Sequence, residues 1–494
     1  MKLWIISFLL PLAFSFNDFM MEEVWIRPLP LSRVALHFDV SIEASLSKMH
    51  YDLFPKMIGQ MLAKYSTQSL SFSMVSGVWD VHTYGRPFAP SASFGSTLNA
   101  TVSKNTSAST WQGLKSELAA LFSASLVQMD KTTTTVITNM EKDTVTFFAT
   151  LPREEVCTEN LTPWCKLLPC RTHTGLAQLV DTLRTVGADY FDLSLHAEIL
   201  DNGNVKLRQT LTKVVRMQKE EWSIASLVRG TSDDEKLLVK ACPLSTTSRI
   251  YVEADETMEF IKKPEEIKMI SLPWCSSKKS EKKIGAIYKL SKEVALDMNT
   301  IGVRKTQEGT FEQEVVSVHR FITGYGQVHG GLALRITNKH TTLPFRVDYT
   351  DHIPWFLRLY FSTVRLSIGG KELDPRAALL DYKFQPAEDH GRPNVLAFAV
   401  DLRPNSTLVL SIQFDKVFIQ LEQHPRDANR GMDVAGARVI VSSLKTSSFP
   451  TYETSLVDAQ VSPDAVLILY KDFVSQYMPF YVQSMSCMFS FFLH

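Results

Sequence analysis

The chain has 494 residues, 45% of them hydrophobic, and its 52 basic side chains are matched by 52 acidic ones. A chain of this length can bury a large core and predicts two or three domains. The balanced charge argues against binding to bulk nucleic acid, which requires a basic surface.

The first 15 residues have the pattern of a secretory signal peptide. A short positive region precedes an apolar run from Leu3 to Phe14, and Ala13 and Ser15 are small residues at positions suited to a signal peptidase. A short buried helix is the alternative, which the proline inside the run disfavours. We therefore expect residues 1–15 to be removed and the bulk of the chain to enter the lumen of the secretory pathway.

Four N-x-S/T sequons agree with lumenal entry, because this pattern is the acceptor for N-linked glycans. They begin at Asn99, Asn105, Asn160 and Asn405. The Asn160 site is the weakest candidate, since Pro163 follows it directly.

Apolar residues at helical spacing predict helices at 53–65, 114–126 and 176–183. Period-two alternation predicts strands elsewhere, and at 34–42 the polar alternate positions predict a strand with one wet face. The other predicted strands are 207–215, 332–336, 364–368 and 408–414.

A polar segment at 256–284, which contains the charged run 278–283, is interpreted as a linker. It would separate an α+β domain at 16–255 from an almost all-β domain at 285–475. The predicted fold class is α+β, mainly β, with antiparallel sheets packed as sandwiches. A propeller-like arrangement of the strands is the alternative.

The C-terminal tail, residues 478–494, contains an apolar segment of 14 residues from Phe480 to Leu493. A membrane-spanning helix requires about 20 residues. Three interpretations stay open: a buried terminal segment, an interfacial anchor, or the first half of a spanning helix.

Common catalytic and cofactor motifs are absent from the sequence. It contains no G-x-S-x-G elbow, no H-E-x-x-H helix, and no Walker or Rossmann glycine pattern. No histidine pairs with a cysteine at metal-ligand spacing. We therefore expect no metal, no cofactor and no active site, although a Cys/His dyad assembled in space remains the enzymatic alternative.

Six cysteines are present, and three of them fall within the 14 residues from Cys157 to Cys170. The complete set is Cys157, Cys165, Cys170, Cys242, Cys275 and Cys487. Cys487 lies in the apolar tail, so five cysteines remain for the lumen and at least one is odd. An odd cysteine in a secreted chain indicates either a free thiol or a bond to another protein.

The segment LPREEVCTENLTPWCKLLPC, residues 151–170, resembles the signature of the phosphatidylinositol-glycan class T family of glycosylphosphatidylinositol (GPI) transamidase subunits. Further similar segments keep their order along residues 22–480. They are 51–66 (YDLFPKMIGQMLAKYS), 208–212 (RQTLT), 242–252 (CPLSTTSRIYV), 320–327 (RFITGYGQ), 353–360 (IPWFLRLY) and 411–414 (SIQF).

This resemblance implies a noncatalytic scaffold or stabilising subunit in the membrane of the endoplasmic reticulum. The family's complex removes a C-terminal signal peptide from a proprotein and attaches a GPI lipid, using the cysteine of a separate caspase-like subunit. The residue matching the family's intersubunit disulfide is Cys157. Partners would be that catalytic subunit and other membrane subunits, with GPI lipid and proprotein reached through the complex.

The resemblance also bears on the remaining cysteines and on the tail. Cys170 and Cys242 match family cysteines, and we expect them to pair, although the resemblance does not establish this bond. Cys165 stands where the family has lysine, so it could exchange with Cys157 or pair with Cys275. The family's transmembrane helix begins near Met478, where this chain carries only the short apolar segment.

A second hypothesis is a stand-alone lumenal module that binds glycans or GPI. It would use surface aromatic side chains such as Trp79, Tyr84 and Trp355 on a β-sandwich.

Overall fold

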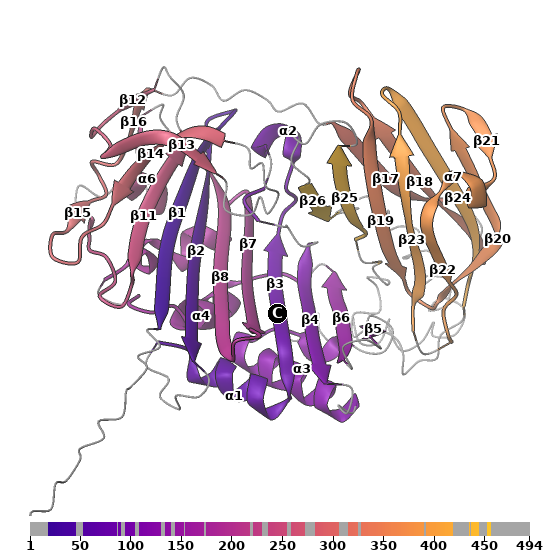
Figure 1. The fold of residues 1–494 in the computed structure, drawn as a ribbon, viewed down its shortest axis with the longest axis horizontal. Coiled ribbons are helices and arrows are strands. Elements are labelled where there is room, and N and C mark those ends of the chain that lie inside the picture. The colour runs from indigo at the N-terminus through magenta and orange to yellow at the C-terminus, as the bar shows by residue number, and fades with distance from the viewer. Residues whose placement is uncertain are drawn as a thin grey trace, which may run out of the picture.

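The computed structural model contains two units, each with its own hydrophobic core (Figure 1). The residues that it describes are 18–45, 53–85, 87–89, 94–103, 108–129, 134–139, 144–152, 154–171, 174–217, 221–229, 236–253, 258–271, 282–305, 315–324, 328–389, 392–417, 434, 436–443 and 452–455.

The first unit is built on an 11-stranded sheet with the order β13-β14-β11-β1-β2-β8-β7-β3-β4-β6-β5. Neighbouring strands are antiparallel except β1 and β11, which run parallel. The strands are β1 Phe19–Leu29, β2 Arg33–Ser45, β3 Thr67–Ser76, β4 Gly95–Ser103, β5 Thr134–Asn139, β6 Thr144–Pro152, β7 Tyr190–Ile199, β8 Asn204–Arg216, β11 Thr247–Glu253, β13 Glu266–Ser271 and β14 Lys282–Lys289.

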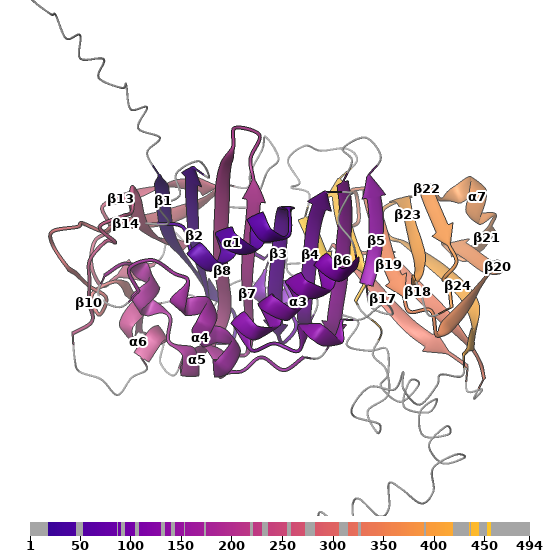
Figure 2. The same cartoon turned by 90° about the horizontal axis from the view of Figure 1, so that it is seen from below.

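Helices cover one face of this sheet (Figure 2). They are α1 Lys56–Lys64, α3 Ala108–Phe122, α4 Thr158–Lys166, α5 Thr182–Val186 and α6 Ile224–Arg229, with the 3-10 turns η1 Leu126–Gln128 and η2 Leu176–Leu179. The predicted helices 53–65 and 114–126 correspond to α1 and to α3 with η1. The predicted helix 176–183 is split, because Val180 is extended and the Asp181 carboxylate caps a new helix by accepting from the Arg184 amide.

The face of the sheet opposite the helices is called the outer face here. His37, Asp39 and Asp192 lie on it. The prediction that β2 has one wet face is wrong, because His37 is 0% and Asp39 4% exposed. A second apolar cluster covers part of this face, including residues around the short helix α2 Val81–Tyr84. Phe88 from this segment stacks on the His37 ring at 5.3 Å.

The prediction that residues 256–284 form a linker between two domains is also wrong. This segment contains β12 Glu259–Phe260, β13 and the start of β14, and the last two strands extend the first sheet. Alternate residues Ala286 and Tyr288 of β14 are buried in the first core, which explains why this strand packs onto the sheet. The first unit also contains four further short strands, which lie outside the 11-stranded sheet and the last of which is its final strand. They are β9 Trp222–Ser223, β10 Leu238–Val239, β15 Leu296–Asp297 and β16 Gly302–Lys305.

The second unit begins at β17 and is a sandwich of two five-stranded sheets that share one core. One sheet has the order β17-β18-β24-β20-β21 and the other β22-β23-β19-β25-β26. The elements are β17 Val316–Thr323, β18 His329–Asn338, β19 Phe345–Ile353, β20 Leu357–Ile368, β21 Lys371–Leu373, α7 Pro375–Ala378, β22 Leu380–Gln385, β23 Asn394–Leu402, β24 Ser406–Lys416, β25 Arg438–Ser443 and β26 Tyr452–Ser455. The predicted α+β, mainly β class and the sandwich are thus confirmed, and the propeller-like alternative does not describe this unit.

Within the described ranges, no helix is both long and apolar enough to cross a membrane. The predicted signal peptide 1–15 and the apolar tail 478–494 lie outside those ranges.

Candidate docking site around Cys157

Cys157 stands at the N-terminal end of α4, in the helical layer of the first unit. It is the N-cap residue, with extended backbone angles φ −120° and ψ −179°, and its side chain is an exposed free thiol. An exposed sulfur at the end of a packed helix can meet another protein without any rearrangement of the core.

The Asn160 side chain, which is 3% exposed, fixes the position of this thiol. Asn160 Oδ1 accepts hydrogen bonds from the Cys157 backbone N–H at 2.8 Å and from its Sγ at 3.2 Å. Asn160 Nδ2 donates to the carbonyls of Phe122 and Ser123, both at 3.0 Å, where α3 ends. One amide therefore joins the end of α3 to the start of α4.

This geometry corrects the prediction that Asn160 is a glycan acceptor. Both Nδ2 hydrogens are used inside the protein, and the side chain has no room for a sugar. The Cys-x-x-Asn spacing, in which an N-cap residue faces the third residue of a helix, was the sequence signal that could have revealed this role.

The rest of α4 is held against the sheet. Trp164 is 1% exposed, and its indole Nε1 donates to the Ser194 carbonyl at 2.9 Å. The Gln209 amide of β8 donates to the Trp164 carbonyl at 3.2 Å. Trp164 is therefore a core residue, and it is not exposed as an interface anchor would be.

Cys165 lies on the same helix but cannot compete with Cys157. It is buried, and burial raises the pKa of its thiol to about 11. Since the thiolate is the reactive form, this cysteine is protected from exchange. Cys157 and Cys165 are both free, so they do not pair with one another, and Cys275 lies outside the described residues.

A disulfide joins Cys170, just after α4, to Cys242, which follows β10; it is the pair expected from the family resemblance. The two Cα atoms are 5.6 Å apart, and the bond closes a separation of 72 residues. The buried Glu22 carboxylate lies behind it, accepting from the backbone N–H groups of Cys242 at 3.0 Å and Leu176 at 2.9 Å. The segment that carries Cys157 is thus fastened to the segment that follows β10.

The remaining predicted glycan sites differ in their surroundings. Asn405 is exposed in the turn between β23 and β24, with a left-handed φ of 49°. Asn99 lies in the middle of β4 and is half-buried, with its Oδ1 out of contact with solvent. Asn105 falls outside the described residues.

The aromatic residues predicted to form a glycan-binding surface are buried. Trp79 is 9%, Tyr84 8% and Trp355 1% exposed. Trp79 packs edge-on against Tyr190 at 5.1 Å, and its Nε1 donates to the Gly85 carbonyl. These side chains serve the cores, so that part of the prediction is wrong. Within the part of the chain that the structure describes, no group of three or more His, Cys, Asp or Glu side chains could hold a metal ion.

Comparison with known proteins gives the family. The model of the family described as "Gpi16 subunit, GPI transamidase component" matches residues 3–237 and 216–488. The GPI-anchor transamidase component PIGT of Mus musculus is 31% identical over 479 residues, covering 87% of this chain and 78% of its own. The GPI transamidase component GPI16 of Saccharomyces cerevisiae is 24% identical over 491 residues, covering 86% and 80%.

Among solved structures, the collagen-binding subdomain of the Enterococcus faecalis surface protein ACE covers 29% of this chain and 94% of its own. Its TM-score is 0.20 with 8% sequence identity, which is too low to support an argument. The sequence matches extend over both units of the fold, including the Cys157 helix and the sandwich. The chain belongs to the Gpi16 family of GPI transamidase components.

Proposed function

We propose that this chain is a noncatalytic scaffold of the GPI transamidase complex, tethered through Cys157 to the caspase-like catalytic subunit. It would act in the membrane of the endoplasmic reticulum, with its bulk in the lumen. Other membrane subunits would complete the assembly, and GPI lipid and proprotein would be reached through it.

The observation that carries this proposal is the contrast between the cysteines. Cys170 and Cys242 are used inside the chain and Cys165 is buried, whereas Cys157 is free and exposed. Its helix is anchored by Trp164, and its sulfur is oriented by Asn160.

A covalent tether makes every further contact between two subunits effectively intramolecular, so a modest interface can persist. This physical effect supports the scaffold role, because a thiol on a packed helix can hold a partner close to the first unit. The GPI-binding alternative loses its original support, since the aromatic residues proposed for it are buried.

Electrophoresis of the native complex under non-reducing conditions tests the tether. The wild-type chain should migrate as a mixed disulfide, and Cys157→Ser should abolish that band. Cys165→Ala is the matched control on the same helix and should retain it. If wild type and Cys157→Ser migrate identically, with both proteins free of a disulfide link, the tether does not exist.

A further inference from the structure

The large sheet has an open edge at β13. In the described part of the chain this strand pairs with β14 alone, in an unbroken register over all six residues from Glu266 to Ser271. The backbone N–H and C=O groups on its other side can therefore pair with a further strand. Two apolar side chains on this edge are exposed, Ile267 at 59% and Met269 at 54%. A regular edge with exposed apolar side chains is a site at which another strand can join a sheet.

Two edge strands of the second unit, β21 and β22, carry the features that usually prevent such pairing. β21 is only three residues long. The pairing of β22 with β23 is irregular between Leu380 and Lys383, where Asp381 has a left-handed φ of 47°. β13 is longer than β21 and has no such irregularity, so its edge remains suited to a partner strand.

The side chains around the β13 edge carry an excess of positive charge. Lys268 lies on β13 itself, and Lys289 of β14 stands beside Arg249 of β11 in the strand register. One exposed carboxylate, that of Glu266, serves both lysines, with its oxygens 2.5 Å from Lys289 Nζ and 3.1 Å from Lys268 Nζ. Hydrogen bonds from Lys289 and Lys268 lower the pKa of Glu266 to about 2. Three cations thus share one exposed anion, and exposed pairs of this kind are weak.

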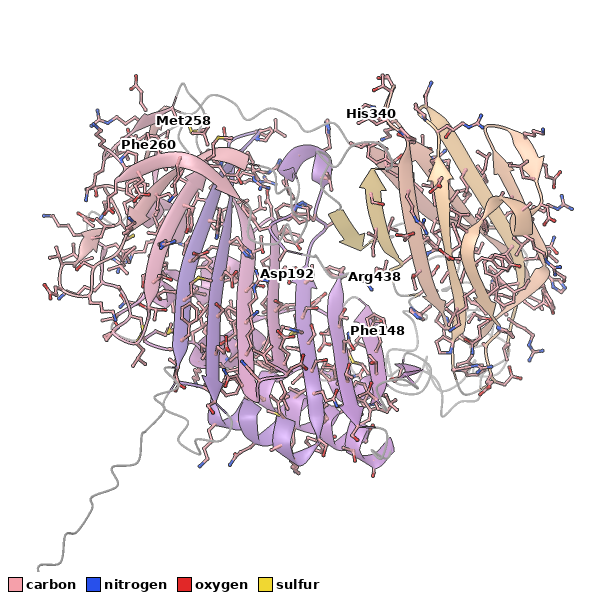
Figure 3. All side chains as sticks on the ribbon, viewed as in Figure 1. Phe148, Asp192, Met258, Phe260, His340 and Arg438 are labelled. Carbon is pink, nitrogen blue, oxygen red and sulfur yellow. A yellow bond between two sulfur atoms is a disulfide. The ribbon has the colours of Figure 1, made fainter. Side chains whose placement is uncertain are left out.

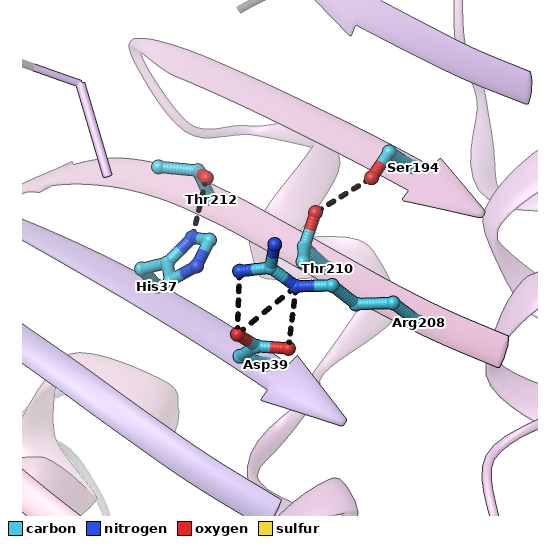
Figure 4. A network of polar contacts seen from close by, with 6 residues as sticks. All are labelled: His37, Asp39, Ser194, Arg208, Thr210 and Thr212. Atoms are coloured by element: carbon cyan, nitrogen blue, oxygen red, sulfur yellow. Dashed lines mark hydrogen bonds and ion pairs between the residues drawn. The ribbon is translucent and has the colours of Figure 1, made fainter. Parts of the chain in front are cut away.

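Two further carboxylates on the adjoining outer face are buried and already engaged. Asp39, which is 4% exposed, receives a bidentate ion pair from Arg208, with Nη2 at 2.7 Å and Nε at 3.1 Å (Figure 4). Glu23, which stands beside Arg249 in the register, is 8% exposed and accepts a hydrogen bond from Tyr251 Oη at 3.1 Å. The exposed charge at the β13 edge therefore stays positive.

We propose that the β13 edge binds an extended segment of a partner subunit, in which acidic and apolar residues alternate, as one further strand of the 11-stranded sheet. Its apolar side chains pair with Ile267 and Met269 across the edge, and its acidic side chains pair with Lys268. Main-chain hydrogen bonds supply affinity, and the alternation supplies specificity. A second copy of this chain would bring the same positive charge to the edge, which disfavours it as the occupant. This surface goes beyond the scaffold proposal and does not involve Cys157, which lies in the helical layer.

Photo-cross-linking of the full chain in its intact complex provides the test. The probe is p-benzoylphenylalanine, placed in separate variants at positions 267 and 269, and the captured peptides are identified by mass spectrometry. Both positions should capture the same segment of a partner subunit, and acidic and apolar residues should alternate in it. Failure of both positions to capture a partner subunit would overturn the proposal. Capture of a segment without that alternation, or of residues 266–271 from a second copy, would overturn it equally.

Charge variants, made with the probe at position 269, test the selection of an acidic strand. Lys268→Glu should fold, because this side chain is 59% exposed. It should lower the cross-linking yield about fivefold, because it places like charges opposite one another. Lys268→Arg keeps the charge and should keep the yield, as should Lys371→Glu on β21, which is the matched control on another edge strand. A yield from Lys268→Glu equal to that of the unchanged chain contradicts the proposal.

Hydrogen–deuterium exchange on the same complex gives an independent measurement. With a strand on each side of β13, its consecutive amides should all exchange slowly, because each is hydrogen-bonded to one neighbour or the other. Fast exchange at every second amide of β13 would show an unoccupied edge and overturn the proposal. The mixed disulfide is followed in the same samples on non-reducing gels. An unoccupied edge with the disulfide intact would reject this inference and leave the Cys157 tether standing.

Discussion

Replacement of Lys213 by methionine should stabilise the protein, because this lysine is buried and no acidic side chain among the described residues forms an ion pair with it. Lys213 is 0% exposed in the core between β8 and the helices, and its Nζ donates to Thr185 Oγ1 at 3.4 Å. Burial lowers its pKa from 10.5 to about 8. Each pKa unit corresponds to about 1.4 kcal/mol, so the charged amine costs about 3 kcal/mol of folding free energy at pH 7.

Methionine has a similar length and fills irregular core space. The substitution gives up one long hydrogen bond, worth about 1 kcal/mol, and Thr185 Oγ1 still donates to the Asp181 carbonyl. We therefore expect Lys213→Met to raise the free energy of unfolding by about 2 kcal/mol at pH 7.

The pH dependence identifies the cause. Because the folded pKa is the lower one, the unfolded chain holds the proton more tightly between pH 8 and 10.5. Raising the pH through this window stabilises the wild type and should erase the advantage of Lys213→Met. Urea denaturation at pH 7 and pH 10 measures both values, with the exposed Lys166→Met as control. A destabilised variant at pH 7, or a gain independent of pH, would refute the reasoning.

Three further predictions concern other parts of the first unit. Asp192 lies on the outer face (Figure 3), and burial raises its pKa from 3.8 to about 7, so Asp192→Asn should stabilise by up to about 4 kcal/mol at pH 8. This gain should disappear as the pH falls to about 3, below the ordinary carboxyl pKa of 3.8, where the wild-type carboxyl is mostly protonated in both states. Thermal unfolding at pH 8 and at about pH 3 measures the gain, and an equal gain at both values contradicts the prediction. Removal of the disulfide by Cys170→Ala with Cys242→Ala should cost about 4 kcal/mol in urea denaturation, given the 72-residue separation, and a change below about 1 kcal/mol would count against its role as a fastening. Asn160→Ala should reduce the mixed disulfide on non-reducing gels, whereas Thr162→Val, which cancels the sequon but keeps Asn160, should not; equal loss in both would point to a glycan instead.

Much of the second unit could be predicted from sequence, because its strands alternate regularly between buried and less buried residues. In β19 every second side chain from Phe345 to Ile353 is buried, and β24 behaves similarly. A sandwich has this simple period, so the alternation identifies both the strands and the core.

The first unit was harder because burial on its outer face is contributed by distant segments. His37 and Asp39 have the pattern of a solvent-facing strand, but Phe88 and the strands beyond β11 cover them. The predicted linker has the composition of a solvated loop, yet β14, which begins within it at Lys282, places its alternate residues Ala286 and Tyr288 in the core. Neither pairing between distant strands nor a covered polar face is encoded in local periodicity.

The candidate site was only partly readable from sequence. The family resemblance singled out Cys157, but it did not distinguish that cysteine physically from Cys165 on the same helix. That distinction needed burial, which makes one thiol exposed and the other inert. The part played by Asn160 was hidden behind its sequon, because a glycan acceptor and a helix-capping amide look alike in sequence.

Mapping of disulfide-linked peptides from the native complex, after alkylation of free thiols and digestion without reduction, tests the central claim most directly. We predict a peptide containing Cys157 joined to a peptide of the caspase-like subunit, with Cys165 recovered as an alkylated free thiol. Recovery of Cys157 itself as an alkylated free thiol from an intact, active complex would contradict the account.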